Sequence, residues 1–314
     1  MGEKMNISIM KFGGIAVSTR KNRDYIVKIV SKSYDKILIV ASAMGRIGFP
    51  YATDTLLELI DEKYIDIKEK NRLLATGEII STIVLANQLK QNEINAYALS
   101  LKEVGIYKTH FNMENILRLF ERYDVLIAPG FLYLNEQNEV ETLARGGGDY
   151  SAVLLAHALN IKEVNLYKDV PGVMPFVFPG YKNVKCYEKL DYLDALALSD
   201  IGYKIVQRDA LEFSKKHNIS LIIKSFILDN DGTIISNFIT SNSYIGTSFS
   251  KDSILIATKN IESVKEELEN FFLENRLYFK ELITNNNNLE FKFGVNQLQL
   301  AKKRVVDQFF GKFL

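Results

Sequence analysis

The chain has 314 residues, of which 47% are hydrophobic, so it is long and apolar enough to bury a large core in two domains. Its formal net charge of +1 gives no general attraction to nucleic acid or to a membrane surface. The single cysteine, Cys186, excludes an internal disulfide framework and fits a reducing compartment. Without an apolar run of about 18 residues or a signal-like start, the sequence predicts a cytoplasmic protein without nucleic-acid or membrane partners.

The first predicted strand, residues 7–12, brings a lysine to a glycine turn. Lys11 lies near the end of this apolar segment, and Gly13 and Gly14 follow it. Glycine lets the backbone approach a ligand closely, so the ammonium group and the bare loop together suit a phosphate. Residues 19–33 then carry apolar side chains at helical spacing, which predicts a helix after this strand.

Residues 36–40 predict a second strand, which also ends in a glycine-containing loop, 42–45. Its continuous apolar character is typical of a parallel sheet that is buried on both faces. The segment 54–60 has a helical pattern, and Thr53 and Asp54 are placed to cap it. The chain therefore begins as an alternation of strands and helices, which is typical of an α/β fold.

The segment 79–89 is apolar enough to form a buried helix, with the sequence Thr-Gly-Glu at 76–78 as its head. A carboxylate at the start of a helix is favoured by the helix dipole, which is one explanation for Glu78. Short strands are predicted next, at 96–99 and 125–128.

Three consecutive glycines, Gly146, Gly147 and Gly148, precede Asp149 and an apolar segment, 150–156, that predicts a helix. Close backbone approach and the free N–H groups of a helix N-terminus favour an anion site. The alternative is a tight turn in which Asp149 only caps the helix. Because parallel sheets bind ligands beyond the carboxyl ends of their strands, we expect the three glycine loops to share one crevice.

Further strands are predicted at 163–167 and 220–226, with a helix at 191–198 between them. From about residue 240 the pattern changes to one strand, a helix, two strands and a last helix. These five elements are predicted at residues 253–258, 262–275, 278–283, 289–293 and 297–310.

Four motifs, in their order and spacing, resemble those of aspartate kinases in the amino acid kinase family. They are Lys11-Phe12-Gly13-Gly14, Ser42-Ala43-Met44-Gly45, Thr76-Gly77-Glu78-Ile79-Ile80-Ser81 and Arg145-Gly146-Gly147-Gly148-Asp149. The segment 42–57 is similar to the form found in the bacterial diaminopimelate and lysine branch. The likeness spans residues 5–236.

The resemblance implies an α/β protein with two domains. Residues 1–238 would form a three-layer αβα catalytic domain with a mainly parallel sheet, and residues 239–314 a small α+β domain resembling a single, incomplete ACT module. The five C-terminal elements are one strand short of that module. ACT modules generally pair, so we expect a homodimer through the C-terminal domain, or a strand taken from residues 236–244.

The activity that the resemblance implies is ATP-dependent phosphorylation of the side-chain carboxylate of L-aspartate to 4-phospho-L-aspartate, the first step of lysine, threonine and methionine biosynthesis. Moving a phosphoryl group onto a carboxylate needs positioning and charge neutralisation rather than a protein nucleophile. Mg2+ would arrive with ATP, and the scattered histidines His110, His157 and His217 predict no dedicated metal site.

The residues expected to carry this reaction fall into three groups. The catalytic residues are Lys11, Asp149 and Lys204. The residues that bind the nucleotide and its phosphates are Gly13, Gly14, Ser42, Gly45, Gly146, Gly147 and Asp169. The residues that bind the substrate are Thr53, Glu78 and Arg145, whose guanidinium suits a second carboxylate.

Several positions differ from the pattern of the family. Ile15 and Ala16 replace threonine and serine, Gly148 replaces serine, Lys168 replaces threonine, 103–105 replace Gln-Ala-Gly, 175–179 replace Thr-Ala-Asp-Pro-Arg, and 207–209 replace His-Pro-Arg. Two alternatives therefore stay open. One is a degenerate paralogue that binds a ligand or regulates an active aspartate kinase, and the other is a kinase of the same family acting on a different carboxylate or a carbamate.

Overall fold

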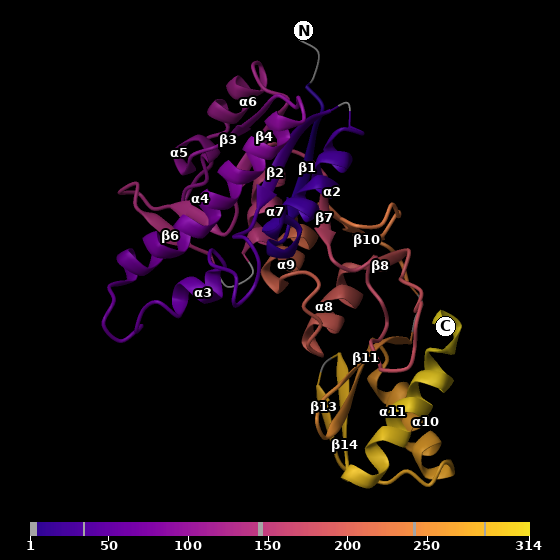
Figure 1. The fold of residues 1–314 in the computed structure, drawn as a ribbon. Helices are drawn as coiled ribbons and strands as arrows, with labels where there is room; N and C mark the ends of the chain where they lie inside the picture. Colours follow the sequence, from indigo (N-terminus) through magenta and orange to yellow (C-terminus); the bar gives the residue numbers. More distant parts are fainter. Residues whose placement is uncertain (1–4, 34, 144–146, 241–242, 286) are drawn as a thin grey trace. The chain divides into compact units, whose positions relative to one another are not determined.

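The computed structural model describes residues 5–33, 35–143, 147–240, 243–285 and 287–314 (Figure 1). It divides into two compact units. The first contains the chain up to Pro171 together with Lys216–Asp231, and the second contains Gly172–Lys215 and Gly232–Leu314. These units differ from the predicted domains, 1–238 and 239–314, and that domain division stays a prediction.

A parallel sheet forms the centre of the first unit, with the strand order β3-β4-β2-β1-β7-β9. Its strands are β1 (Ile7–Phe12), β2 (Lys36–Ala41), β3 (Ala96–Ala98), β4 (Val125–Pro129), β7 (Glu163–Lys168) and β9 (Ser220–Ser225). A two-stranded antiparallel sheet, β5 (Leu132–Leu134) and β6 (Val140–Thr142), lies in the same unit. The parallel strands confirm the expected α/β architecture.

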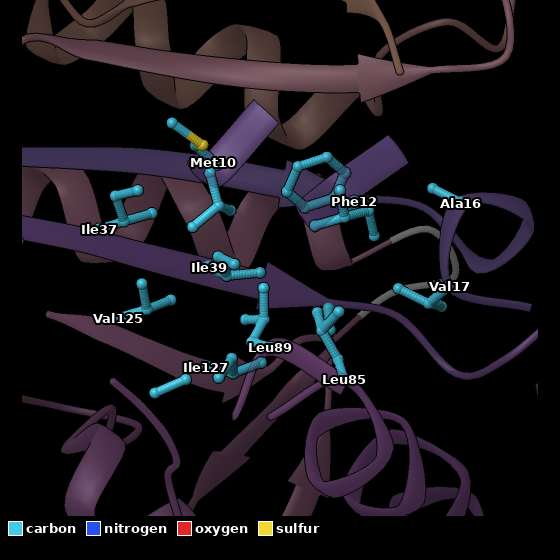
Figure 2. Close-up of a cluster of buried hydrophobic side chains, with 14 of the residues drawn as sticks. Met10, Phe12, Ala16, Val17, Ile37, Ile39, Leu85, Leu89, Val125 and Ile127 are labelled. Carbon is cyan, nitrogen blue, oxygen red and sulfur yellow. The ribbon is translucent and has the colours of Figure 1, made fainter. Parts of the chain in front are cut away.

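Helices cover both faces of this parallel sheet. On one face, α2 (Arg20–Val30) and α4 (Ile67–Gln91) enclose an apolar cluster with alternate residues of the strands. Figure 2 shows Leu85 and Leu89 of α4 directed at the strand residues Ile39 and Ile127. The helix α7 (Gly148–Ala158) packs against β1, β2 and β7 on the opposite face. The result is a three-layer αβα arrangement.

The remaining helices of the first unit are short. They are α1 (Gly14–Ser18), α3 (Thr53–Leu57), α5 (Leu101–Val104) and α6 (Glu114–Phe120). The prediction that Thr53 or Asp54 caps its helix is wrong, because α3 begins at Thr53 and the buried Ala52 occupies the N-cap position without a side-chain bond. The carbonyl oxygen of this N-cap residue accepts the first hydrogen bond of the helix, from the N–H of Leu56.

The longest helix, α4, begins earlier than the sequence predicts. Its N-cap is Asp66, whose side chain accepts a hydrogen bond from the N–H of Lys68 at 2.7 Å. Glu78 therefore lies inside the helix and not at its head, so the dipole explanation for this residue is wrong. Gly77 lies inside the same helix and gives close packing: a Cβ atom there would lie 2.7 Å from the carbonyl oxygen of Tyr51 and 3.2 Å from the Cβ of Ala43.

The described part of the second unit contains a parallel strand pair, a four-stranded antiparallel sheet and several helices. Its elements are β8 (Lys189–Asp191), α8 (Tyr192–Asp200), β10 (Thr233–Ser236), β11 (Tyr244–Phe249), β12 (Ser253–Thr258), α10 (Ile261–Glu274), β13 (Phe279–Asn285), β14 (Asn288–Phe293) and α11 (Val295–Phe309), followed by a short 3-10 helix, Gly311–Phe313. Helix α9 (Arg208–His217) runs along the chain from this unit into the first.

The antiparallel sheet has the order β11-β12-β14-β13, so its fourth strand is β11. The strand expected from residues 236–244 overlaps this element only at Tyr244, because β11 runs from Tyr244 to Phe249. It pairs with β12 in an antiparallel ladder in which Phe249 lies opposite Ile254, with a shift of register between Tyr244 and Gly246. This small α+β assembly has the ACT-like fold that the sequence predicts.

Candidate active site

The carboxyl end of β1 presents a buried ion pair. Side chains alternate along a strand, so Lys11 faces α7 whereas Phe12 belongs to the apolar cluster on the other face. The Nζ atom of Lys11 lies 2.9 Å from Oδ1 of Asp149, and the two residues are only 6% and 4% exposed. Asp149 is the second residue of α7, after the N-cap Gly147, so it does more than cap the helix.

A second lysine binds the same carboxylate. Lys168, the last residue of β7, places its Nζ atom 2.8 Å from Oδ2 and 3.0 Å from Oδ1 of Asp149. The strands β1 and β7 are parallel neighbours, with Phe12 in register with Tyr167, which brings the two lysines to one edge of the sheet. Sequence reasoning noted Lys168 only as a departure; its place at the end of an apolar strand was the available signal.

These contacts set the ionisation of the cluster. Burial alone would raise the pKa of Asp149, but the ammonium groups of Lys11 and Lys168 outweigh it and hold that pKa well below the usual range. Burial lowers the pKa of Lys168, an effect that the carboxylate of Asp149 opposes and the charge of Lys11 reinforces. Asp149 is therefore an anion that holds two lysine side chains in fixed positions.

The glycine loops meet around this cluster. The N–H of Gly45 donates to the carbonyl oxygen of Gly14 at 2.8 Å, so the loops after β1 and β2 are joined. A Cβ atom at Gly148 would lie 3.0 Å from Cε of Lys11 and 3.1 Å from Oγ of Ser42. A serine at position 148 would crowd both side chains, which explains why glycine fits here. The three loops thus adjoin one another, as the parallel sheet predicts.

Glu78 lies close to the same loops. It is 3% exposed, and its Oε2 atom has no hydrogen-bond partner among the residues that the structure describes. Burial raises its pKa to about 8, although a hydrogen bond with the backbone of Ala43 and the charge of Lys11 both favour the ionised form. A buried carboxyl oxygen without a hydrogen-bond partner is costly. The Oε2 atom of Glu78 is therefore suited to a ligand that carries a hydrogen-bond donor or a positive charge.

The remaining predicted site residues are Asp169, Lys204, Thr53, Arg145 and Gly146. Asp169 is exposed and forms a salt bridge with Arg46 at 3.3 Å. Lys204 belongs to the second unit, where it is exposed in the loop between α8 and α9. Thr53 is half-buried at the first residue of α3. The predicted residues Arg145 and Gly146 lie outside the described residues.

The segment 175–179 has a structural explanation for its departure from the family pattern. Phe176 is fully buried in the aromatic core of the second unit. The carbonyl oxygen of Pro175 accepts a hydrogen bond from the N–H of Thr247 in β11 at 2.9 Å. Apolar residues in this segment therefore bind it to the antiparallel sheet of its own unit.

The described part of the chain has neither a helix that could span a membrane nor a ready-made metal site. None of its helices is long and apolar enough to cross a membrane. Within the same residues, no group of three or more histidine, cysteine, aspartate or glutamate side chains is arranged to hold a metal ion.

Comparison with curated proteins finds aspartokinases. The chain is 31% identical over 248 residues to aspartokinase 1 of Bacillus subtilis, covering 74% of this chain and 61% of that protein. It is 28% identical over 302 residues to an aspartokinase of Geobacillus stearothermophilus, covering 90% of this chain and 73% of that protein. The chain thus spans about three fifths of the length of the first relative.

Solved structures share the fold. E. coli aspartokinase III in complex with aspartate and ADP has a TM-score of 0.68 at 16% identity, covering 96% of this chain and 83% of that chain. A UMP kinase from Bacillus anthracis has a TM-score of 0.53 at 19% identity and covers 74% of this chain and 97% of that one. Residues 6–225, including β1, α7, β7 and the cluster around Asp149, match the amino acid kinase family, and the chain therefore belongs to that family.

Proposed function

We propose that this chain transfers the γ-phosphoryl group of ATP to the side-chain carboxylate of L-aspartate, giving 4-phospho-L-aspartate. The observation that carries the proposal is the buried cluster of Lys11, Asp149 and Lys168 at the carboxyl ends of β1 and β7. Phosphoryl transfer between two anions depends on fixed positive charge more than on covalent chemistry. A lysine held by a buried aspartate supplies such charge without reorganising during the reaction.

In the proposed reaction a carboxylate oxygen of the substrate attacks the γ-phosphorus. The bond from that phosphorus to the β–γ bridging oxygen breaks, and ADP leaves with the electron pair, so no protein group gains or loses a proton. Lys11 would neutralise charge on the transferring phosphoryl oxygens, and the backbone of Gly13 and Gly14 would border them. Mg2+ would arrive with ATP, held mainly by phosphate and water.

The amino-acid substrate is proposed to bind on the Glu78 side of the loops. Glu78 would receive the substrate ammonium group, since its Oε2 atom has no partner among the described residues. Thr53 and Arg145 complete this proposed subsite, with the arginine on the second carboxylate. The names of the relatives favour aspartate, and the E. coli enzyme of the same fold contains aspartate and ADP.

The proposed nucleotide side consists of Ser42, Gly45, Gly146, Gly147 and Asp169, with Lys204 as a further cation. We also retain three proposals from the sequence: a catalytic domain at 1–238, an ACT-type domain at 239–314, and a homodimer formed through the latter. Membership of the lysine and diaminopimelate branch rests on the segment 42–57 alone.

The test is to trap aspartyl phosphate with hydroxylamine after incubation with ATP, Mg2+ and L-aspartate. We expect the wild type to form the hydroxamate and Lys11→Met to lose it by about 100-fold or more, the scale of a lost electrostatic contact in the transition state. The fold should survive, because Asp149 keeps its pair with Lys168.

A matched control is Lys90→Met, which removes an exposed lysine in the last turn of α4. This variant should react at the wild-type rate. A folded wild type that forms no hydroxamate would contradict the proposed function and favour a regulatory, non-catalytic relative. Hydroxamate formed only from another carboxylate would instead point to a different substrate.

A further inference from the structure

The cluster around Asp149 contains more positive than negative charge. Lys11 and Lys168 both bind this single buried carboxylate, so two ammonium groups share one direct counter-charge. Asp169, the residue after Lys168, adds a negative charge nearby, but its side chain is exposed and paired with Arg46. Glu78 does not correct the excess, because its raised pKa keeps it largely protonated at neutral pH. Buried charge without a counter-charge is costly, and one lysine would already neutralise Asp149. The second lysine needs another explanation.

Both ammonium groups lie at the edge of the sheet, at the carboxyl ends of β1 and β7. The side chain of Lys11 is 8% exposed and that of Lys168 is 16% exposed, so neither is fully enclosed. Beside Lys11, a Cβ atom built at Gly13 would have only Nζ of that lysine within 4 Å among the described residues, at 3.8 Å. The N-terminus of the 11-residue helix α7 adds its positive dipole at the same place.

We infer that Lys168 is a second phosphate-binding cation, which acts beside Lys11 on the phosphate oxygens of the nucleotide. The inference rests on the proposed function and extends it to a residue at which the resembling family usually has threonine. A threonine hydroxyl donates one neutral hydrogen bond, whereas an ammonium group donates charge-assisted bonds and offsets the charge that gathers on ADP as it leaves. The carboxylate of Asp149 favours the charged form of Lys168 and fixes the direction of both lysines.

The experiment measures nucleotide binding and turnover separately. Calorimetric titration with a non-hydrolysable ATP analogue and Mg2+ is compared for the wild type, Lys168→Met, Lys168→Thr and Lys168→Arg. We expect the first two variants to bind the analogue about 10-fold more weakly or worse, the effect of one lost charge-assisted bond, and the arginine variant to recover part of the affinity. The kcat for aspartyl phosphate should fall in the same order.

Lys224→Met is the matched control. Lys224 lies on the neighbouring strand β9 in register with Tyr167, so its side chain points to the face opposite that of Lys168. Its replacement should leave affinity and kcat unchanged. Melting temperatures of all variants check folding, since Asp149 keeps Lys11 as a partner in each of them.

The outcomes separate the inference from the proposed function. Weaker analogue binding in Lys168→Met supports the inference even where no aspartyl phosphate forms. Wild-type affinity and kcat in that variant, combined with wild-type kinase activity, overturn the inference and leave the function standing, because Lys168 would then only neutralise Asp149. A folded wild type that binds no nucleotide overturns both.

Discussion

Glu78 makes the stability of the protein depend on pH in a defined direction. Burial raises its pKa in the folded protein to about 8, from an ordinary value of 4.5. Between these values the folded state keeps a proton that the unfolded state releases. The contribution of Glu78 to the free energy of unfolding is therefore full below pH 4.5 and is lost as the pH rises through 8. Within that window the loss is about 1.4 kcal/mol per pH unit.

This prediction is checked by urea denaturation of the wild type and Glu78→Gln at several pH values. The glutamine cannot ionise, so the difference in unfolding free energy between the two proteins isolates the carboxyl group. We expect the wild type to lose stability relative to Glu78→Gln from pH 5 to pH 8. A difference that stays constant over this range would show that Glu78 titrates normally in the folded protein.

At the level of single residues, the sequence predicted the parts of the site that depend on local pattern. Lys11, Ser42 and the glycines each follow a recognisable strand, and the structure brings those described into one region. The sequence did not predict that Lys168 belongs to the site, because the pairing of β1 with β7 is what brings Lys168 beside Lys11 and Asp149. That register depends on two strands far apart in the chain, and no short motif records it.

Among the elements, α4 shows how packing overrides a local signal. Glycine costs about 1 kcal/mol relative to alanine inside a helix, so Gly77 is locally unfavourable in the interior of α4. The structure keeps the helix continuous because the glycine permits contact with the backbone of Tyr51 and the side chain of Ala43. The same helix carries Glu78, so this contact also positions a candidate site residue beside the loop after β2.

We therefore predict that Gly77→Ala destabilises the protein although it improves helix propensity. The added Cβ atom would lie 2.7 Å from a carbonyl oxygen, which is backbone and not the end of a flexible side chain. Overpacking of this kind costs about 1–3 kcal/mol, more than the gain of about 1 kcal/mol in propensity. Chemical denaturation measures the net change.

The control for this helix is Thr76→Ala, at the preceding exposed position. Alanine there also improves propensity but meets no backbone oxygen, so the unfolding free energy should change by about 0.5 kcal/mol or less. If Gly77→Ala were as stable as Thr76→Ala, the helix and the Tyr51 turn would have room to separate, and the packing explanation for the glycine would fail.

For the molecule as a whole, the division into units cuts across the order of the sequence. After β7 ends at Lys168, the chain enters the second unit at Gly172. There Phe176 packs in the same core as Phe272 of α10 and Phe310, the residue that follows α11. The sequence predicted α8 and the elements from β12 to α11, because their periodicity is local, but it did not predict the short strands β8 and β10. It did not reveal that 175–179 join them, since that contact links distant segments.

This packing predicts that Phe176 stabilises the second unit through contacts made far along the chain. Its side chain is fully buried, so Phe176→Ala should lower the unfolding free energy by about 3–5 kcal/mol, the cost of removing a core phenylalanine. The neighbouring Val177 is 69% exposed, and Val177→Ala should change the stability by about 0.5 kcal/mol or less. Thermal and chemical denaturation of the full chain compare the two.

A chain cut after residue 238 tests the same point on a larger scale. It would keep Phe176 but lose the core partners Phe272 and Phe310, so we expect it to expose apolar surface, bind a hydrophobic dye and melt at a lower temperature than the full chain. If residues 1–238 instead melted at the temperature of the full chain without binding the dye, the predicted domain 1–238 would be an independent folding unit. In that case the aromatic contacts of 175–179 would contribute little to its stability.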